Sequence, residues 1–360
     1  MIAAGPTTRC VGQRGMMNRD RVVDLRSDTV TKPSPAMRRA MAEAEVGDDV
    51  LERDPTTQRL EERIAELTGF DAALFFPSGV QANQTAVWLH TERGTEVVLE
   101  ASAHLVLYEI GGIAGLAGAQ IRPVSTPDGV LTAELARAVW PPVSPHVARV
   151  SLLCAENTHN AAGGKVMPLE VWDDIVALAR EQGVRLHLDG ARVWHAATAL
   201  GVTPARAVQG ADSVMVCLSK GLGCPVGSCL AGSSDLIGRA REVRRRFGGA
   251  MRQSGILGAA GLYALEHNLE RLSEDHANAR LLAERLAEHP AVCPVDPDSN
   301  IVMLDLLRPG DTAEMVLPKL AEEGVLLLPF GPARLRAVTH LDVSREALEW
   351  AADVIGRVLS

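Results

Sequence analysis

Short apolar runs alternate with amphipathic stretches along most of the chain. The stretch VWDDIVALAREQ (171–182) places its apolar residues at the spacing of a helix face, and Gly183 follows as a typical helix end. Short apolar runs between such helices are typical of a largely parallel sheet covered on both faces. The pattern therefore predicts an α/β fold with a mostly parallel, doubly wound sheet. The expected strands are ALFF (73–76), EVVLE (96–100), RVSLLCAE (149–156), VRLHLD (184–189), SVMVCLS (213–219) and GSCLAG (227–232).

Turn-forming and capping residues dominate the beginning of the chain. The segment VDLRSDTVTKPSPAM combines a strand-like start with several Asp, Thr, Ser and Pro residues, so an ordered arm is expected over 24–44. A helix is expected in DPTTQRLEERIAELTG, because Asp54 is a favoured N-cap and Gly69 a favoured C-terminal stop. Residues 1–23 are irregular and polar, and they are expected to form a leader outside the fold.

The alternation of single strands and helices ends in the last quarter of the chain. A helix is expected over 255–272, and a long helix rich in Ala, Leu, Glu and Arg continues from it. NIVMLDL, VLLLPF and LRAVTHLDV then predict three strands, which with two helices suggest a smaller α/β layer. The boundary is placed near residue 270, inside a continuous helix. The expected units are the leader (1–23), the arm (24–44), a large domain (45–270) and a small C-terminal domain (271–360).

Composition narrows the class of protein. A chain of 360 residues with 47% hydrophobic and 22% charged residues suits a globular α/β protein with a substantial core. The formal charge of −9 disfavours nucleic acid and anionic membranes as partners, since both favour basic surfaces. The run between Ile110 and Ile121 is too short and too rich in Gly to span a bilayer, so no membrane segment is expected.

Six cysteines are scattered along the chain without a CxxC pair or a His at zinc-finger spacing. No metal site is assigned from this pattern. Free thiols fit a reducing cytoplasm, which is the predicted location. Cys217, Cys224 and Cys229 surround Lys220 in the sequence and are interpreted as small packing residues.

Polar residues gather where the expected strands end. In an open parallel sheet, ligands bind beyond the carboxyl ends of the strands. ALFF is followed by PSGVQAN, a turn of small residues that opens a helix and whose free amides would hold a phosphate. Taken alone, some such turns are only helix caps. EVVLE is followed by His104, and RVSLLCAE delivers Glu156 and Asn157, each of which could be satisfied structurally. The two strands after these end in Asp189 and Arg192 and in Lys220.

Lys220 follows a hydrophobic strand in Gly-rich surroundings. A lysine ammonium is costly to bury there, so a Schiff base is one interpretation and a side chain that reaches solvent is the other. Asp189, one strand earlier, supplies a carboxylate that would keep a pyridinium nitrogen protonated. Together with the phosphate-type turn, these residues complete the three anchors that pyridoxal 5'-phosphate (PLP) requires. The combination predicts a PLP enzyme.

Eight segments resemble, in order and spacing, their counterparts in the low-specificity L-threonine aldolases, which are fold-type I PLP enzymes. The resemblance covers roughly residues 22–360 and implies a large PLP-binding domain with a smaller C-terminal α/β domain. It implies cleavage of L-threonine, L-allo-threonine and related β-hydroxy-α-amino acids to glycine and an aldehyde. It also implies a homotetramer, built as a dimer of dimers with shared active sites. The segments are VDLRSDTVTKP, AEVGDDV, ALFFPSG, ENTHN, LHLDGARVW, CLSKGLGCPVGS, GGAMRQSGILGAAG and RAVTHLDVS.

The resemblance implies roles for residues around the cofactor ring. Lys220 in LSKG matches the lysine that carries the cofactor, and Asp189 in DGAR matches the partner of the pyridine nitrogen. His104 matches the histidine that stacks on the ring. Arg192 matches a residue near the phenolic oxygen and the substrate carboxylate.

Other matching residues are expected at the cofactor phosphate. Ser78, Gly79 and Val80 form the phosphate turn, in which Val80 stands where the family commonly has Thr. The backbone amides survive that change, whereas one hydroxyl contact is lost. Arg252 in MRQSG resembles a residue that reaches the phosphate of a neighbouring subunit.

The substrate is expected to meet a separate set of residues. Ser27 in LRSDT and Arg336 in RAVTH match positions that bind the substrate carboxylate, which a bidentate guanidinium suits. Tyr108 would form a pocket wall and Glu109 would orient a water, while core packing of Tyr108 and a helix-surface charge at Glu109 stay open. His146 matches a second histidine near the substrate hydroxyl, with a surface-loop histidine as the alternative.

Other functions stay open at this level, because fold-type I enzymes share the lysine and the aspartate. Another PLP lyase, such as a β-eliminating enzyme or a phenylserine aldolase, is the alternative activity, against which the substrate-binding residues argue. A non-catalytic protein of this fold would lack Lys220 or its partners, all of which are present. His104 or His146, acting through water, are the candidate bases for the β-hydroxyl proton.

Overall fold

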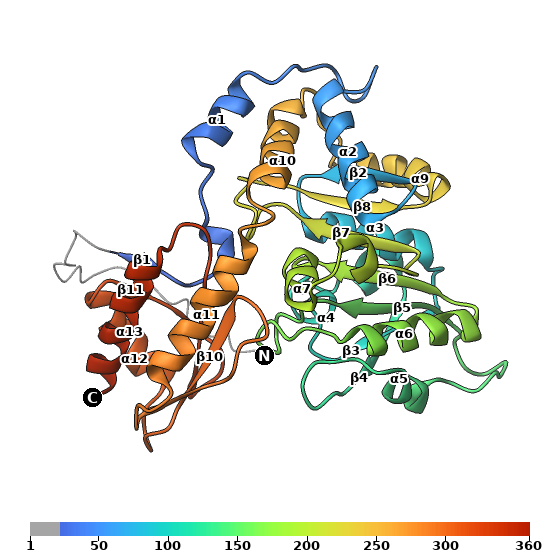
Figure 1. Cartoon of the computed structure of the whole chain (residues 1–360). Helices are drawn as coiled ribbons and strands as arrows, with labels where there is room; N and C mark the ends of the chain where they lie inside the picture. Colours follow the sequence, from blue (N-terminus) through green and yellow to red (C-terminus); the bar gives the residue numbers. More distant parts are fainter. Residues whose placement is uncertain (1–21) are drawn as a thin grey trace, which may run out of the picture.

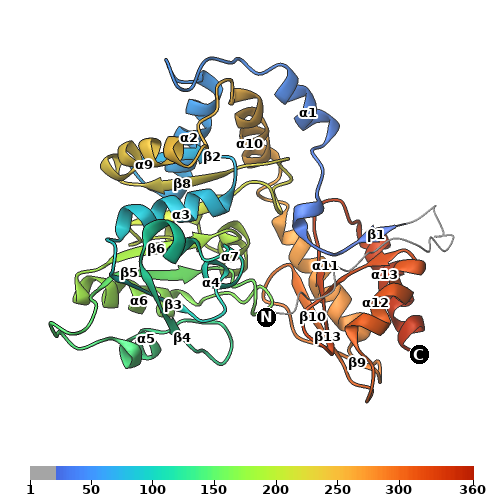
Figure 2. The same cartoon turned by 180° about the vertical axis from the view of Figure 1, so that it is seen from behind.

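The computed structural model describes residues 22–360, and its larger part is built on one seven-stranded sheet (Figures 1 and 2). The strand order is β2-β8-β7-β6-β5-β3-β4. β8 runs antiparallel to both of its neighbours, and the other pairs are parallel, which confirms the predicted α/β fold. The strands are β2 (Ala72–Phe76), β3 (Glu96–Glu100), β4 (Gln120–Val124), β5 (Val150–Glu156), β6 (Arg185–Gly190), β7 (Ser213–Cys217) and β8 (Ser228–Gly232).

Helices cover both faces of this sheet because successive strand side chains point to opposite faces. On β2, Phe75 packs into the core on one face, whereas Leu74 and Phe76 belong to the cluster on the other. The first face is covered by α2 (Pro55–Thr68), α5 (Ala133–Val139), α6 (Leu169–Gln182), α7 (Val193–Leu200), α8 (Pro204–Ala207) and α10 (Gly255–His267). The second is covered by α3 (Gly79–His90), α4 (His104–Leu107), the short helix η2 (Ile113–Ala117) and α9 (Ser234–Arg246).

The local signals in the sequence were sufficient for most of these elements. All six expected strands are present, and α2 begins after Asp54, whose carboxylate accepts from Thr56 N and Thr57 N. α2 ends at Gly69, which has a φ of 72°. β4 was not predicted, because this edge strand is only partly buried and contains Pro123 instead of an apolar run.

The C-terminal part is a separate α/β layer. Its four-stranded antiparallel sheet has the order β12-β13-β10-β9. The strands are β9 (Val292–Pro294), β10 (Ile301–Leu306), β12 (Leu328–Pro329) and β13 (Arg334–Val338), and the helices are α11 (Leu272–Leu286), α12 (Ala313–Glu322) and α13 (Arg345–Leu359). The smaller layer is confirmed, although the short strand β9 was not predicted.

Two expectations for this part were wrong. VLLLPF does not form one strand, because β11 (Val325–Leu326) pairs with β1 (Val23–Asp24) in a separate two-stranded sheet, whereas β12 pairs with β13. The helix near residue 270 is also not continuous. α10 ends at His267 and α11 begins at Leu272, and Asn268 in the break donates from Nδ2 to the Leu222 carbonyl at 2.8 Å. This bond draws the helix break toward the loop that carries Lys220.

The N-terminal arm joins the two parts. β1 pairs in parallel with β11, and Leu25 is fully buried in the core of the C-terminal part. The arm continues through the 3₁₀ turn η1 (Asp28–Val30) to α1 (Pro35–Ala42), which packs on α10 (Figure 1). The predicted leader lies outside the described residues, except for Val22 and Val23.

The structure adds two observations on the predicted class of protein. Between residues 22 and 360, no helix combines the length and apolar character needed to cross a membrane. Cys217, Cys224 and Cys229 are free, buried and part of apolar clusters, which confirms the packing interpretation. The cytoplasmic location stays a prediction.

Candidate active site

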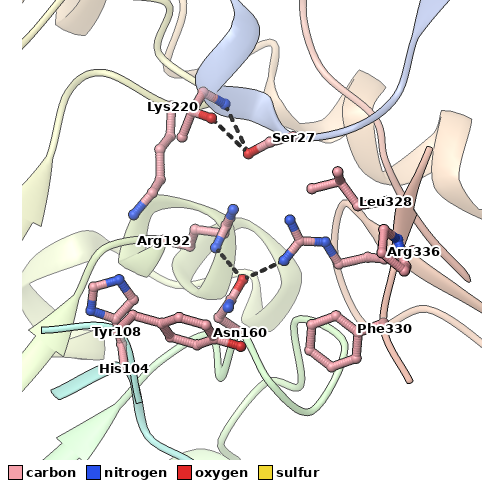
Figure 3. A pocket seen from close by; sticks show the side chains of 11 residues that line it. Ser27, His104, Tyr108, Asn160, Arg192, Lys220, Leu328, Phe330 and Arg336 are labelled. Carbon is pink, nitrogen blue, oxygen red and sulfur yellow. Dashed lines mark hydrogen bonds between the residues drawn. The ribbon is translucent and has the colours of Figure 1, made fainter. Parts of the chain in front are cut away.

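A cavity of about 350 Å³ lies where the arm, the large sheet and the C-terminal part meet (Figure 3). The large part contributes loop and helix residues that follow strands of its sheet. The C-terminal part contributes β12, β13 and the residue after β12. The lining residues are Ser27, Thr29, His104, Tyr108, Asn160, Arg192, Lys220, Leu328, Pro329, Phe330 and Arg336.

Lys220 extends into this cavity from the loop after β7 (Figure 3). The loop is held by its backbone, because the Lys220 carbonyl accepts from Gly223 N at 2.8 Å and from Thr31 Oγ1 at 3.2 Å. Gly223 has a φ of 76°, a conformation that favours glycine. The sequence therefore builds a rigid turn that presents the amine of Lys220 to the cavity.

Asp189 lies behind the cavity and is fully buried near the end of β6. Its Oδ2 accepts from Asn83 Nδ2 at 2.9 Å, and its Oδ1 accepts from Ala191 N at 3.1 Å. A buried carboxylate with fixed donors is suited to face a cationic ring nitrogen.

His104 lines the cavity, and its ring lies near Asp189. Its Nδ1 donates to Glu109 Oε1 at 2.9 Å. Burial disfavours protonation of His104, but the hydrogen bond to Glu109 and the nearby carboxylate of Asp189 outweigh it and raise its pKa. Glu109 is only 4% exposed, which excludes the helix-surface alternative, and Tyr108 is 46% exposed and lines the cavity, which excludes core packing.

His104, Glu109 and Asp189 also form a group whose potential ligand atoms lie within 4.8 Å of one another. Asn83 Nδ2 donates to both carboxylates, at 2.8 Å to Glu109 and 2.9 Å to Asp189. An amide donor therefore already bridges the two acids, and we assign no metal to this group.

A buried ion pair holds Arg192, which lines the cavity. Arg192 donates from Nε and Nη2 to the two oxygens of Asp28, at 2.8 Å and 2.7 Å. Burial opposes ionisation of Asp28, but the Arg192 guanidinium holds the pKa of this carboxyl well below its ordinary value. The pair fixes the guanidinium plane of Arg192.

Arg192 and Arg336 converge on one acceptor, Asn160 Oδ1, from 3.2 Å and 3.0 Å (Figure 3). Arg336 Nε is buried without a hydrogen-bond partner among the described residues. Burial and the neighbouring Arg192 lower the pKa of Arg336. Asp28, which is bonded to Arg192, is the only acidic group among these hydrogen-bonded residues, so one carboxylate faces two guanidinium groups. This end of the cavity therefore suits an added anion.

Asn160 is held by a buried carboxylate that also holds His104. Glu156 Oε1 accepts from Asn160 N at 2.8 Å, and Glu156 Oε2 accepts from His104 N at 2.7 Å. Burial raises the pKa of Glu156, although His159 acts in the opposite direction. One side chain at the end of β5 thus positions residues on two sides of the cavity.

Several of these residues were not identified from the sequence. Asn160 and Asp28 were not assigned roles, although each lies in a recognised segment, ENTHN and LRSDT. The apolar wall formed by Leu328, Pro329 and Phe330 was also missed, since VLLLPF has only a core-like pattern. Membership of these segments was the available signal for the first two.

The phosphate turn is present at the start of α3. Ser78 is the N-cap, and its Oγ accepts from Gln81 N at 3.2 Å. A Cβ added to Gly79 would lie 3.2 Å from the Met215 side chain, so a larger residue would crowd this close approach. Ser78, Gly79 and Val80 are not among the described residues that line the cavity, and their contact with a phosphate stays a prediction.

His146 and Arg252 lie away from the cavity within one protomer. His146 is exposed in the loop between α5 and β5, where its backbone N–H donates to Ser144 Oγ. Arg252 is exposed and pairs with Asp48 at 3.0 Å. The structure does not bring either side chain to Lys220, so their proposed roles require a neighbouring subunit.

Together, these residues are suited to hold PLP. Lys220 and His104 line one cavity, and the buried Asp189 lies behind it near His104. The tightly packed Gly79 opens a helix at a capped N-terminus. Lys220 would hold the aldehyde carbon, Asp189 the ring nitrogen and the α3 amides the phosphate.

Two buried histidines lie behind the Lys220 loop. His195 Nδ1 and His276 Nε2 are 2.9 Å apart, and their rings stack with centroids 5.1 Å apart. A Cβ added to Gly221 would lie 2.5 Å from His195 Nε2, so the pair packs directly against the loop. Burial, reinforced by the other histidine, lowers the pKa of His195 to about 3, and burial lowers the pKa of His276 to about 4.

Mild acid is expected to destabilise the protein through this pair. Unfolded histidines bind protons below about pH 6.5, whereas folded His195 and His276 stay neutral to much lower pH. The free energy of unfolding should be retained above pH 6.5 and fall as the pH decreases toward 4, by at most ~1.4 kcal/mol per pH unit for each ring. His276→Gln cannot take up a proton and should flatten this slope in urea unfolding; an unchanged slope would contradict the expectation.

Known proteins match both the sequence and the fold. Residues 24–308 match the family described as Beta-eliminating lyase. The chain is 44% identical over 332 residues to "Low-specificity L-threonine aldolase 1" of Arabidopsis thaliana, covering 90% of this chain and 92% of that protein. It is 46% identical over 328 residues to "Low specificity L-threonine aldolase" of Escherichia coli O157:H7, covering 91% and 96%.

A solved structure of SPT with its PLP internal aldimine has the same fold, with a TM-score of 0.74, 18% identity and coverage of 94% of this chain and 87% of that one. This likeness concerns the fold alone. The family matches are much stronger, because both threonine aldolases named above exceed 40% identity over at least nine-tenths of the chain. The chain therefore belongs to the β-eliminating lyase family, within the group of the low-specificity L-threonine aldolases.

Proposed function

We propose that this protein uses PLP on Lys220 to cleave L-threonine, L-allo-threonine and related β-hydroxy-α-amino acids to glycine and an aldehyde. One observation carries the proposal: Lys220, Arg192 and Arg336 face a single cavity backed by Asp189. An amine, a carboxylate-binding pair and a ring-nitrogen partner are the groups that this carbon–carbon lyase reaction needs. The names of the curated relatives support the same activity.

The arginine end of the cavity would bind the substrate carboxylate. Arg192 is locked by Asp28, and Arg336 keeps an unpartnered Nε and a lowered pKa that an incoming anion would reverse. Ser27 lies on the same side, at the cap of η1. Fixing the carboxylate fixes the rotation about the N–Cα bond, which decides which bond to Cα breaks.

The opposite end would handle the proton of the β-hydroxyl group. The Nδ1–H group of His104 donates a hydrogen bond to Glu109. Nε2 of His104 is therefore the atom that can exchange a proton with the substrate, directly or through water. Glu109 and Asp189 raise the pKa of His104, which makes its ring a stronger base for this proton than an ordinary histidine. PLP, when bound, supplies the electron sink for the charge left on Cα.

Arg336→Lys is expected to weaken amino-acid binding more than turnover. Lysine keeps a positive charge but loses the planar pair of donors, so we expect KM for L-threonine to rise by about 10- to 100-fold with a smaller change in kcat. Steady-state kinetics at varied L-threonine measure this. Arg334→Lys on the same strand is the matched control, because Arg334 pairs with Asp305 and does not line the cavity. Equal effects of the two substitutions would contradict the assignment.

A product assay tests the proposed function. Purified protein with PLP is incubated with L-threonine and with L-allo-threonine, and glycine, aldehyde, keto acid and ammonia are measured. Release of glycine and aldehyde supports the proposal and ranks the two stereoisomers. Formation of a keto acid and ammonia would instead favour a β-eliminating or deaminating lyase on the same cofactor.

We also propose that the protein works as a homotetramer with shared sites. Large apolar side chains are exposed next to the cavity wall, among them Leu107 at 52% and Ile110 at 98% exposure. Such exposure is typical of a surface that is covered in an assembly. The test mixes inactive Lys220→Ala and Arg252→Ala subunits, since a shared site would regain activity in the hybrid. A monomeric mass by light scattering would contradict this proposal.

A further inference from the structure

A buried chain of hydrogen bonds leads from Asp189 to the end of α3. Asn83 Nδ2 donates to Asp189 Oδ2 at 2.9 Å, and His187 Nε2 lies 3.1 Å from Asn83 Oδ1. His187 Nδ1 lies 2.8 Å from Ser213 Oγ, which lies 2.8 Å from His90 Nε2. Asn83, His187 and Ser213 are fully buried. We call Asn83, His187, Ser213 and His90 the Asn83–His90 chain. None of them takes part in the substrate binding or proton transfer proposed for the cavity.

The orientation of Asn83 determines the first link. Both protons of its amide nitrogen point to carboxylates, Glu109 Oε1 at 2.8 Å and Asp189 Oδ2 at 2.9 Å. A flipped amide would place its oxygen against two acids, so Nδ2 must face them. Asn83 Oδ1 is therefore an acceptor, and its partner His187 Nε2 must carry a proton.

The remaining links follow from the first. Burial, reinforced by His90, lowers the pKa of His187 to about 3, so the ring is neutral and has one proton. With that proton on Nε2, His187 Nδ1 accepts from the Ser213 hydroxyl, and Ser213 Oγ in turn accepts from His90 Nε2–H. Burial lowers the pKa of His90 to about 4, although Asp212 acts against it. Each group is thus neutral, with one possible proton arrangement.

We infer that Asn83, His187, Ser213 and His90 are positioning residues that hold Asp189 as an ionised carboxylate. Every donor in the chain points toward Asp189, so their dipoles add in the direction that stabilises its negative charge. An ionised Asp189 keeps the proton on the pyridine nitrogen, so this inference rests on the proposed function of Asp189. The Asn83–His90 chain thus acts through Asp189 on the cofactor's strength as an electron sink, without touching substrate or cofactor.

A purely structural role is the competing explanation, because buried polar groups need partners in any fold. That role predicts a loss of stability when the chain is broken. It does not predict a change in the protonation of the ring nitrogen. The nitrogen is therefore the group to observe.

The test compares His187→Leu with His187→Gln in holoenzyme loaded with PLP labelled with ¹⁵N at the ring nitrogen. Leucine removes the donor to Asn83 Oδ1, whereas glutamine retains an N–H donor. For His187→Leu we expect the ¹⁵N shift to move toward the unprotonated position and kcat to fall about 10-fold, with KM within about twofold. For His187→Gln we expect both the ¹⁵N shift and kcat to return to the values of the parent protein. An unchanged ¹⁵N shift in folded His187→Leu would overturn the inference.

Two further variants cover the case in which His187→Leu does not fold. Ser213→Ala and His90→Leu break the chain at increasing distance from Asp189. Both should move the ¹⁵N shift in the same direction, with the smaller effect at His90. No movement in Ser213→Ala would also overturn the inference.

A separate measurement is independent of the aldolase reaction. Histidine ¹H–¹⁵N spectra of the PLP-free parent should show His187 and His90 neutral and protonated at Nε2. A proton on Nδ1 of His187, or a cationic ring at neutral pH, would overturn the chain whatever the enzyme catalyses. A parent that binds PLP but releases no aldehyde would instead refute the proposed function and leave the ¹⁵N test intact.

Discussion

Lys220→Ala is expected to abolish cleavage of L-threonine, lowering kcat by on the order of 10⁴-fold or more, because no other described side chain in the cavity offers an amine for the Schiff base. The protein should stay folded. The bonds that hold the loop are accepted by the Lys220 carbonyl, which alanine retains. The measurement is glycine and aldehyde release at saturating substrate, with the visible absorbance of the PLP-loaded protein.

Lys319→Ala is the matched control for this change. Lys319 is exposed on α12 and does not line the cavity. This variant should keep both colour and activity. A coloured and active Lys220→Ala protein would show that another group carries the cofactor.

Asp189→Ala is expected to lower kcat by roughly 10²- to 10³-fold, which is the usual cost of removing one preorganised electrostatic partner of the reacting group. Without the carboxylate, the ring nitrogen loses the charge that keeps it protonated, so the electron sink weakens. Binding of PLP should suffer less, because Lys220 and the phosphate turn remain. Steady-state kinetics and a PLP titration separate the two effects.

The control for Asp189→Ala is Asp174→Ala, at an exposed position of α6. It removes the same charge from the protein without touching the cavity. If both variants kept full kcat, Asp189 could not be the partner of the ring nitrogen. If Asp189→Ala bound no PLP at all, its main role would be binding.

The elements of the large sheet could be predicted because their signals are local. A buried strand needs a short apolar run, and a helix needs a spaced apolar face and capping residues such as Asp54 and Gly69. Where the signal was weak, the prediction failed. β4 is a partly exposed edge strand, and the helix break at Asn268 depends on a carbonyl in the Lys220 loop.

The candidate site was predictable where a residue type carries chemistry inside a recognisable segment. Lys220, Asp189, Arg192 and Arg336 belong to this class, and the structure places all four in or directly behind one cavity. His146 shows the limit of such matching. Its segment aligns by spacing, yet within one protomer the side chain lies exposed in a loop.

The sequence by itself determined the fold class and the family, and it predicted Lys220 as the reactive lysine, because periodicity, caps and short motifs act over a few residues. Only the tertiary structure decided which distant segments complete the site. β1 pairs with β11 about three hundred residues away, and this places Asp28 on Arg192. Asn160 meets two arginines in the same way. Such contacts depend on backbone pairing and buried charge neutralisation between segments, which no local pattern encodes.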